Sequence, residues 1–136
     1  SDSPVMQSGS PRIHVFLADD STAIRERLEA MLAAEGIAVD GGAGTPQACI
    51  DGILASRPDV VVLDVQLEGG TGLQVLKAIR EAAPEVAFVV LSNNAGPAYR
   101  SRYLAHGASD LLDKSSQFDL LPRAVRSAFE RSARRT

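Results

Sequence analysis

Short apolar segments alternate along the chain with longer stretches in which apolar residues recur every three or four positions. The short segments show little polar alternation, which is typical of strands buried on both faces of a sheet. The longer stretches have the period of amphipathic helices. The expected strands are residues 13–18, 37–39, 59–64, 86–91 and 108–112, and the expected helices are residues 22–35, 46–56, 73–83, 97–106 and 118–134.

Residues that favour helix starts and ends stand at these boundaries. Ser21 and Thr45 are suited to cap helix N-termini, with Pro46 at a first helical position. Gly36 and Gly107 are suited to end the preceding helices. Strict alternation of five strands with five helices predicts an α/β fold, in which a single-domain (βα)5 chain forms a doubly wound, parallel five-stranded sheet with helices on both faces.

The length and composition fit one domain with a core. The chain has 136 residues, of which 45% are apolar, so general disorder is excluded. Residues 1–11 are rich in Ser, Gly and Pro and are expected to be a flexible tail, residues 12–130 the domain, and residues 131–136 a basic end. The longest apolar run, residues 86–91, is far shorter than the roughly 20 residues that span a membrane. A single cysteine, Cys49, excludes a disulfide framework and favours the reducing cytoplasm.

The net charge of −3 is unevenly distributed. Residues 123–136 hold five arginines and Glu130, a local charge of +4, so the rest of the chain carries −7. An acidic body argues against direct nucleic-acid binding. We interpret the basic end as the solvated face and last turn of a helix, where cations complement the helix dipole, with a docking contact as the alternative.

Polar residues that could carry chemistry directly follow the expected strands. The carboxyl ends of parallel strands meet at one edge of the sheet, where ligands bind. Any one such residue alone is most simply an ordinary strand-end residue, but their recurrence at four strand ends favours a functional site. These residues are the pair Asp19 and Asp20, then Asp64, Ser92, and the pair Asp113 and Lys114.

The chemistry of this set points to phosphoryl transfer. Asp19, Asp20 and Asp64 would repel one another unless a cation joined them, and a few hard oxygen ligands favour Mg²⁺. A carboxylate beside Mg²⁺ can attack phosphorus, and Asp64 is the best nucleophile because it ends the most hydrophobic strand. The hydroxyl of Ser92 and the ammonium of Lys114 could stabilise charge on the transferred group.

The same residues resemble the receiver domains of two-component response regulators. The resemblance covers about residues 12–130 and rests on the Asp19-Asp20 pair, on Asp64 within LDVQLEGGTGLQVL, on Ser92, and on GASDLLDKS, which contains Lys114. It implies a flavodoxin-like sheet order of 2-1-3-4-5. It also implies a phosphoacceptor that switches partner binding within a phosphorelay.

The resemblance assigns a role to each matching position. Asp64 would receive a phosphoryl group from a sensor histidine kinase or a histidine phosphotransfer protein. Asp20 would bind Mg²⁺ directly and Asp19 through water, with the backbone carbonyl of Gln66 as a further ligand. The chain would then act on a downstream protein partner or on a missing effector domain.

The two phosphoryl-binding positions match the family, whereas the aromatic switch position does not. Ser92 resembles the hydroxyl that turns toward the phosphoryl oxygen, and Lys114 resembles the ammonium that pairs with it. The aromatic switch residue of the family lies 19 residues after that hydroxyl, where this chain has Leu111. Tyr99 and Tyr103, on the next expected helix, are candidates to replace it.

Two alternatives accompany the phosphoacceptor interpretation. A pseudo-receiver that is never phosphorylated is supported by Leu111. A hydrolase of the haloacid dehalogenase type needs an Asp two residues after the nucleophile, where this chain has Gln66, so we expect no enzyme activity beyond self-phosphorylation and self-dephosphorylation. Glu68 also replaces the Pro that is usual in the family.

The output of the chain is expected to be indirect. No effector domain follows the last expected helix, which favours a stand-alone receiver over an excised part of a longer regulator. We expect no membrane contact and no direct nucleic-acid contact by this domain. A homodimer is compatible with the sequence.

Overall fold

The computed structural model describes residues 12–94 and 96–135, which form three layers of helix, sheet and helix. The expected flexible tail, residues 1–11, lies outside the described residues. The strands are β1 (His14–Ala18), β2 (Ala38–Ala43), β3 (Val60–Asp64), β4 (Gln66–Leu67), β5 (Gly70–Thr71), β6 (Ala87–Ser92) and β7 (Asp110–Asp113). The helices are α1 (Thr22–Ala34), α2 (Pro46–Ser56), α3 (Gly72–Ala82), α4 (Pro97–Ala105) and α5 (Leu121–Arg135), with a 3-10 turn, η2 (Phe118–Leu120), before the last.

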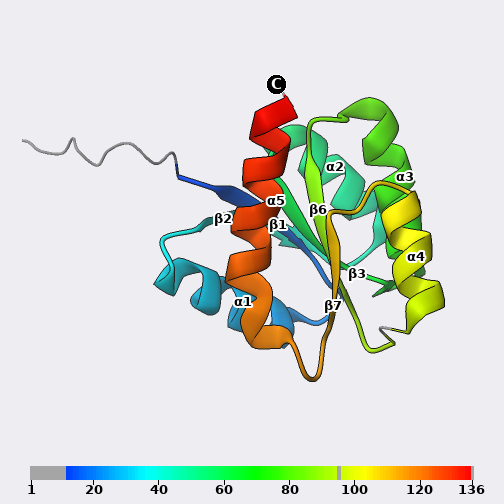
Figure 1. The fold of residues 1–136 in the computed structure, drawn as a ribbon, viewed down its shortest axis with the longest axis horizontal. Helices are drawn as coiled ribbons and strands as arrows, with labels where there is room; N and C mark the ends of the chain where they lie inside the picture. The colour runs from blue at the N-terminus through cyan, green and yellow to red at the C-terminus, as the bar shows by residue number, and fades with distance from the viewer. Residues whose placement is uncertain (1–11, 95, 136) are drawn as a thin grey trace, which may run out of the picture.

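The main sheet is parallel and has the order β2-β1-β3-β6-β7. This order confirms the predicted 2-1-3-4-5, because β4 and β5 form a separate two-stranded hairpin. Figure 1 shows α1 and α5 on one face of the sheet and α2, α3 and α4 on the other. The α/β, doubly wound fold predicted from the alternation is therefore confirmed.

Strand β3 lies at the centre and is buried on both faces. Because side chains alternate across a strand, Val60 and Val62 pack with α1 and α5, while Val61 and Leu63 pack with α2 and α3. All four side chains are buried. The continuous apolar run follows from this double burial, and the strand delivers Asp64 to the carboxyl edge of the sheet.

The helix boundaries follow the predicted signals. The hydroxyls of Ser21 and Thr45 each accept a hydrogen bond of 3.2 Å from a backbone N–H three residues later, as capping residues do. Gly36 and Gly107 follow the ends of α1 and α4 with φ values of +77° and +101°, which side chains other than glycine rarely adopt. These four interpretations are confirmed.

Two segments are more ordered than the sequence predicted. Strand β2 extends to Ala43, because β1 pairs along its whole length and draws Gly41 and Gly42 into the ladder after a register shift at Val15 and Phe16. The sequence pattern predicted this strand over residues 37–39 only. Residues 65–71, which lie between an expected strand and an expected helix, contain the β4–β5 hairpin, whose pairing was not predicted.

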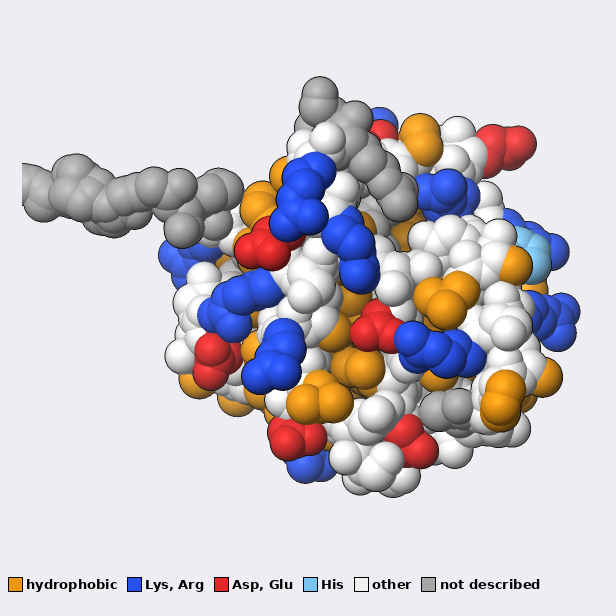
Figure 2. Space-filling model, viewed as in Figure 1, with side chains coloured by type: hydrophobic (Ala, Val, Ile, Leu, Met, Phe, Trp, Pro, Cys, Tyr) orange, Lys and Arg blue, Asp and Glu red, His pale blue; other side chains and the backbone are white. Residues whose placement is uncertain are grey.

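The basic end belongs to α5, which continues to Arg135. Figure 2 shows Lys and Arg side chains gathered along this helix. Two of them connect the helix to its neighbours. Arg126 donates a hydrogen bond of 2.7 Å to the carbonyl of Glu35, and Arg131 donates one of 3.2 Å to the carbonyl of Ser109. Among the described residues, no helix is both long and apolar enough to cross a membrane.

Candidate functional site

The strand ends bring three of the predicted residues into one ion-paired cluster. Asp19 follows β1 and Asp64 ends the neighbouring β3, and they are only 2% and 5% exposed. Lys114 follows β7, and its Nζ lies 2.8 Å from Oδ2 of Asp19 and 2.8 Å from Oδ2 of Asp64. One ammonium therefore bridges carboxylates from two different strands.

The loop after β1 orients the acidic pair. The N–H of Ser21 donates to Oδ1 of Asp19 at 2.9 Å, while the Ser21 hydroxyl caps α1. The same residue thus fixes both the Asp19 carboxylate and the helix start. Asp20 is exposed, and one carboxylate oxygen from each of Asp19, Asp20 and Asp64 lies within 4.8 Å of the other two.

This group of carboxylates fits a hard divalent cation. The three carboxylates carry three negative charges when ionised. Among the described residues, Lys114 is the one cation that forms an ion pair with any of them. Mg²⁺ binds through a few carboxylates and keeps several waters, which the exposed Asp20 permits. The donor set therefore matches the ion expected from the sequence.

The electrostatics of the cluster depend on burial. Burial raises the pKa of Asp64 above its ordinary value, and the hydrogen bond from Lys114 opposes that rise only in part. Burial also lowers the pKa of Lys114, but the hydrogen bonds to Asp19 and Asp64 together outweigh this and leave the pKa raised. Lys114 accordingly keeps its charge. A further cation bound beside Asp64 would stabilise its ionised form, which burial disfavours.

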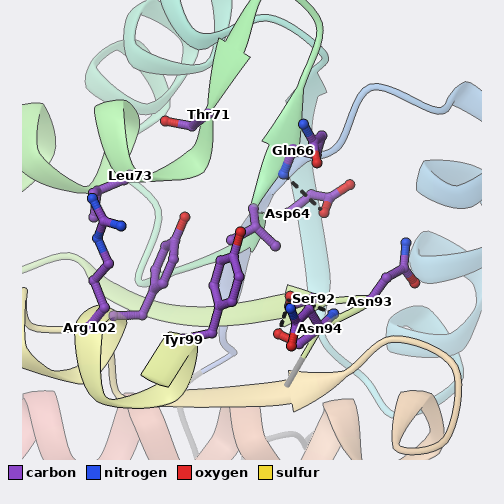
Figure 3. Close-up of a pocket in the computed structure, with 11 residues that line it drawn as sticks. Asp64, Gln66, Thr71, Leu73, Ser92, Asn93, Asn94, Tyr99 and Arg102 are labelled. Carbon is purple, nitrogen blue, oxygen red and sulfur yellow. Dashed lines mark hydrogen bonds between the residues drawn. The ribbon is translucent and has the colours of Figure 1, made fainter. Parts of the chain in front are cut away.

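Ser92 ends β6 beside the cluster, with its hydroxyl engaged in its own loop. The hydroxyl donates to the carbonyl of Asn94 at 2.7 Å and accepts from the N–H of Asn94 at 3.0 Å. Figure 3 shows Asp64, Ser92 and Tyr99 lining one cavity from β3, β6 and α4. This cavity has a volume of about 210 Å³ and gives a small group access to Asp64.

Gln66 lies next to the acceptor position at the start of the hairpin. Its N–H donates to Oδ1 of Asp64 at 3.4 Å, and its side chain is exposed. The metal-binding role of its carbonyl stays a prediction. The fourth strand-end carboxylate, Asp113, is turned away into its own turn, where hydrogen bonds from Ser115 and Ser116 hold its pKa below the ordinary range.

Gly72, the first residue of α3, packs directly behind the acceptor. A Cβ at this position would lie 2.3 Å from the backbone oxygen of Asp64, closer than real contacts allow. We expect Gly72→Ala to lower the free energy of unfolding by about 2 kcal/mol, because the backbone of Asp64 must move. Urea denaturation measures this, with Gly41→Ala as control, since its Cβ would meet only the Phe16 ring at 3.5 Å. Equal stability of the two variants would contradict this packing.

Helix α4 buries an aromatic ring, that of Tyr103, on the side of the sheet where Leu111 also packs. Tyr103 from α4 and Leu111 from β7 are both buried in the same cluster. Burial raises the pKa of Tyr103 to about 12. Its ring stacks on that of Tyr99, with centroids 6.4 Å apart. A role for these tyrosines in switching stays a prediction.

One cation near the site was missed in the sequence. Arg25 is half-buried on α1 and donates from Nη1 to the backbone carbonyl of Asp19. The number of residues between Arg25 and the Asp19-Asp20 pair matches no motif that would have predicted this contact. Gly42 and Gly44 lie against its side chain.

Comparison with known proteins places the chain in one family. The family model for the response regulator receiver domain matches residues 15–126. The response regulator GacA of Pseudomonas aeruginosa is 28% identical over 118 residues, which are 86% of this chain and 55% of the relative. A protein-glutamate methylesterase/protein-glutamine glutaminase of Anaeromyxobacter dehalogenans is 39% identical over 105 residues, 76% of this chain and 30% of the relative.

Solved structures agree. The signal receiver domain of the putative response regulator NarL from Mycobacterium tuberculosis has a TM-score of 0.80 and 28% identity, and the match covers 89% of this chain and 98% of that one. The response regulator domain of Thermotoga maritima CheB has a TM-score of 0.80 and 25% identity, with 88% and 98% covered. The chain spans about half the length of the response regulator GacA and of the transcriptional regulatory protein DesR of Bacillus subtilis. It belongs to the receiver domain family of two-component response regulators.

Proposed function

We propose that residues 12–130 are a phosphoacceptor domain, in which Asp64 takes a phosphoryl group from the phosphohistidine of a histidine kinase or phosphotransfer protein. One observation carries the proposal. Carboxylates from two strands lie within 4.8 Å of one another, and Nζ of Lys114 lies 2.8 Å from both Asp19 and Asp64. This arrangement supports a nucleophile, a cation site and a phosphoryl-binding ammonium at one point.

The transfer is a displacement at phosphorus. An oxygen of Asp64 forms a bond to phosphorus, the phosphorus–nitrogen bond of the donor breaks, and its electron pair leaves with the imidazole nitrogen. Asp20, Asp64 and the carbonyl of Gln66, with Asp19 acting through water, would hold Mg²⁺, and the ion would neutralise charge on the transferred group. Lys114 already contacts Asp64, so a small movement of its ammonium is enough to bind a phosphoryl oxygen.

Ser92 links the phosphoryl state to the surface. To donate to a phosphoryl oxygen, its hydroxyl has to give up the hydrogen bond that it donates to the carbonyl of Asn94. Asn94 lies in the segment that leads to α4, so this exchange changes the balance between two arrangements of the surface formed by α4, β7 and α5. A downstream protein, an effector domain or a second copy would recognise that surface.

The proposal leaves no further catalytic step to this domain. Gln66 stands where a hydrolase of the haloacid dehalogenase type would need an Asp, and an amide cannot donate and recover a proton in that role. We therefore propose self-phosphorylation and self-dephosphorylation as its only reactions. We also propose a cytoplasmic location for the domain, because the thiol of Cys49 is free and buried, as is usual in a reducing compartment.

Small-molecule phosphorylation tests the proposal directly. Incubation with acetyl phosphate and Mg²⁺, followed by intact mass measurement, is expected to show a gain of one phosphoryl group. The gain should disappear when a chelator removes Mg²⁺, because the carboxylates then repel the donor. A chain left unmodified in saturating acetyl phosphate and Mg²⁺ would favour the pseudo-receiver alternative.

A further inference from the structure

The carboxylates of the proposed metal site come from two separate chain segments, and Gly44 joins them. On one side, the carbonyl of Gly44 accepts a hydrogen bond of 2.9 Å from the N–H of Glu68, in the hairpin that follows Asp64. On the other side, a Cβ at Gly44 would lie only 3.1 Å from the Cα of Asp20. The backbone of Gly44 is therefore wedged between the acidic loop and the acceptor hairpin.

Arg25 holds the acidic loop against this junction. Its Nη1 donates to the backbone carbonyl of Asp19, and its Nη2 donates to the hydroxyl of Thr22 at 3.2 Å. The N–H of Asp19 is tied to β2 by a hydrogen bond of 3.0 Å to the carbonyl of Ala43. Both backbone groups of Asp19 thus have a partner: the N–H anchors the peptide that joins Asp19 to Ala18, and the carbonyl anchors the peptide that joins it to Asp20.

Two glycines make room for the guanidinium. A Cβ at Gly42 would lie 2.9 Å from Cδ of Arg25, and a Cβ at Gly44 would lie 3.5 Å from its Nη1. Neither glycine has a positive φ, so no unusual backbone conformation requires a glycine at these positions. Their lack of a side chain matters because Arg25 passes over β2 to reach the carbonyl of Asp19.

We infer that Arg25 and Gly44 are positioning residues that set the separation of the Asp20 and Asp64 carboxylates and thereby the affinity for Mg²⁺. Neither residue has a carboxylate to offer the ion. They act by holding the two segments that carry the carboxylates. The inference rests on the proposed function, since it assigns the surroundings of the same cation site.

Calorimetric titration of the full chain with MgCl₂ tests the inference without any phosphoryl chemistry. Arg25→Gln and Gly44→Ala are each expected to raise the Mg²⁺ dissociation constant about tenfold, as loss of groups that orient metal ligands does. Arg25→Lys keeps a donor and should fall between Arg25→Gln and the wild type. Gly41→Ala, whose Cβ would make only ordinary contact with Phe16, should bind as the wild type does.

Phosphorylation with acetyl phosphate supplies a second readout. Because the variants retain Asp64 and Lys114, their uptake rate at saturating Mg²⁺ should match the wild type, while the Mg²⁺ concentration for half-maximal rate rises. A purely structural role would lower the saturating rate as well. Gly44→Ala tests the contact between the two segments while Arg25 is intact. A folding defect in one of the two variants therefore leaves the other variant informative.

The outcomes separate this inference from the proposed function. If Asp20→Asn abolishes Mg²⁺ binding while Arg25→Gln and Gly44→Ala bind as the wild type does, the positioning role is overturned and the metal site stands. If the wild type binds no Mg²⁺ at all, the metal site fails and the inference fails with it. If both variants weaken binding but the wild type takes up no phosphoryl group, the positioning role holds and the phosphoacceptor proposal is overturned.

Discussion

Asp64→Asn is expected to abolish phosphoryl uptake while leaving the domain folded. The amide has the size of the carboxylate but no nucleophilic oxygen of comparable reactivity, so no acyl phosphate forms. The fold should tolerate the change, because Lys114 keeps its 2.8 Å contact with Asp19 and one of the repelling charges is removed. Intact mass after acetyl phosphate and Mg²⁺, with urea denaturation of the same sample, measures both effects.

Asp113→Asn is the matched control for that experiment. Asp113 also ends a strand at the same edge of the sheet, but its carboxylate accepts hydrogen bonds from Ser115 in its own turn. Phosphoryl uptake should therefore persist in Asp113→Asn. A phosphoryl gain that survived Asp64→Asn would place the acceptor on another residue and would refute the assignment of the nucleophile.

Lys114→Met is expected to destabilise the metal-free domain by about 3 kcal/mol, because it leaves Asp19 and Asp64 buried without their shared cation. Methionine preserves most of the volume of the lysine stem, so the loss reports the charge rather than a cavity. Mg²⁺ should stabilise Lys114→Met more than it stabilises the wild type, since the ion neutralises the same carboxylates. Denaturation curves with and without Mg²⁺ measure the difference.

The chain offers a control for this variant in its only other lysine. Lys77 is exposed on α3, and Lys77→Met should change stability little. The double variant Lys114→Met with Asp64→Asn should recover part of the lost stability, because one unpaired charge is gone. Failure of the double variant to recover any stability would show that Lys114 acts through packing and not through its bridge between the carboxylates.

Much of the fold was predictable because local pattern and long-range packing agree. Residues 59–64 predict a strand buried on both faces, and the sheet places β3 at its centre with helices on each side. The candidate site was predictable for the same reason, since a polar residue directly after such a strand has to emerge at the carboxyl edge. The extension of β2 through Gly41 and Gly42 was not, because pairing with β1 overrides the weak strand propensity of glycine.

The sequence alone thus determined the class of fold, the sheet order through its family resemblance, and the edge at which Asp19, Asp20, Asp64, Ser92 and Lys114 collect. Only the tertiary structure decided how these side chains meet. Lys114 forms ion pairs with two carboxylates, and the Ser92 hydroxyl donates a hydrogen bond to the carbonyl of Asn94. Arg25 donates a hydrogen bond to the carbonyl of Asp19. Periodicity reports which face of an element is buried, but contact distances between side chains depend on how separate elements pack, and no local pattern records that.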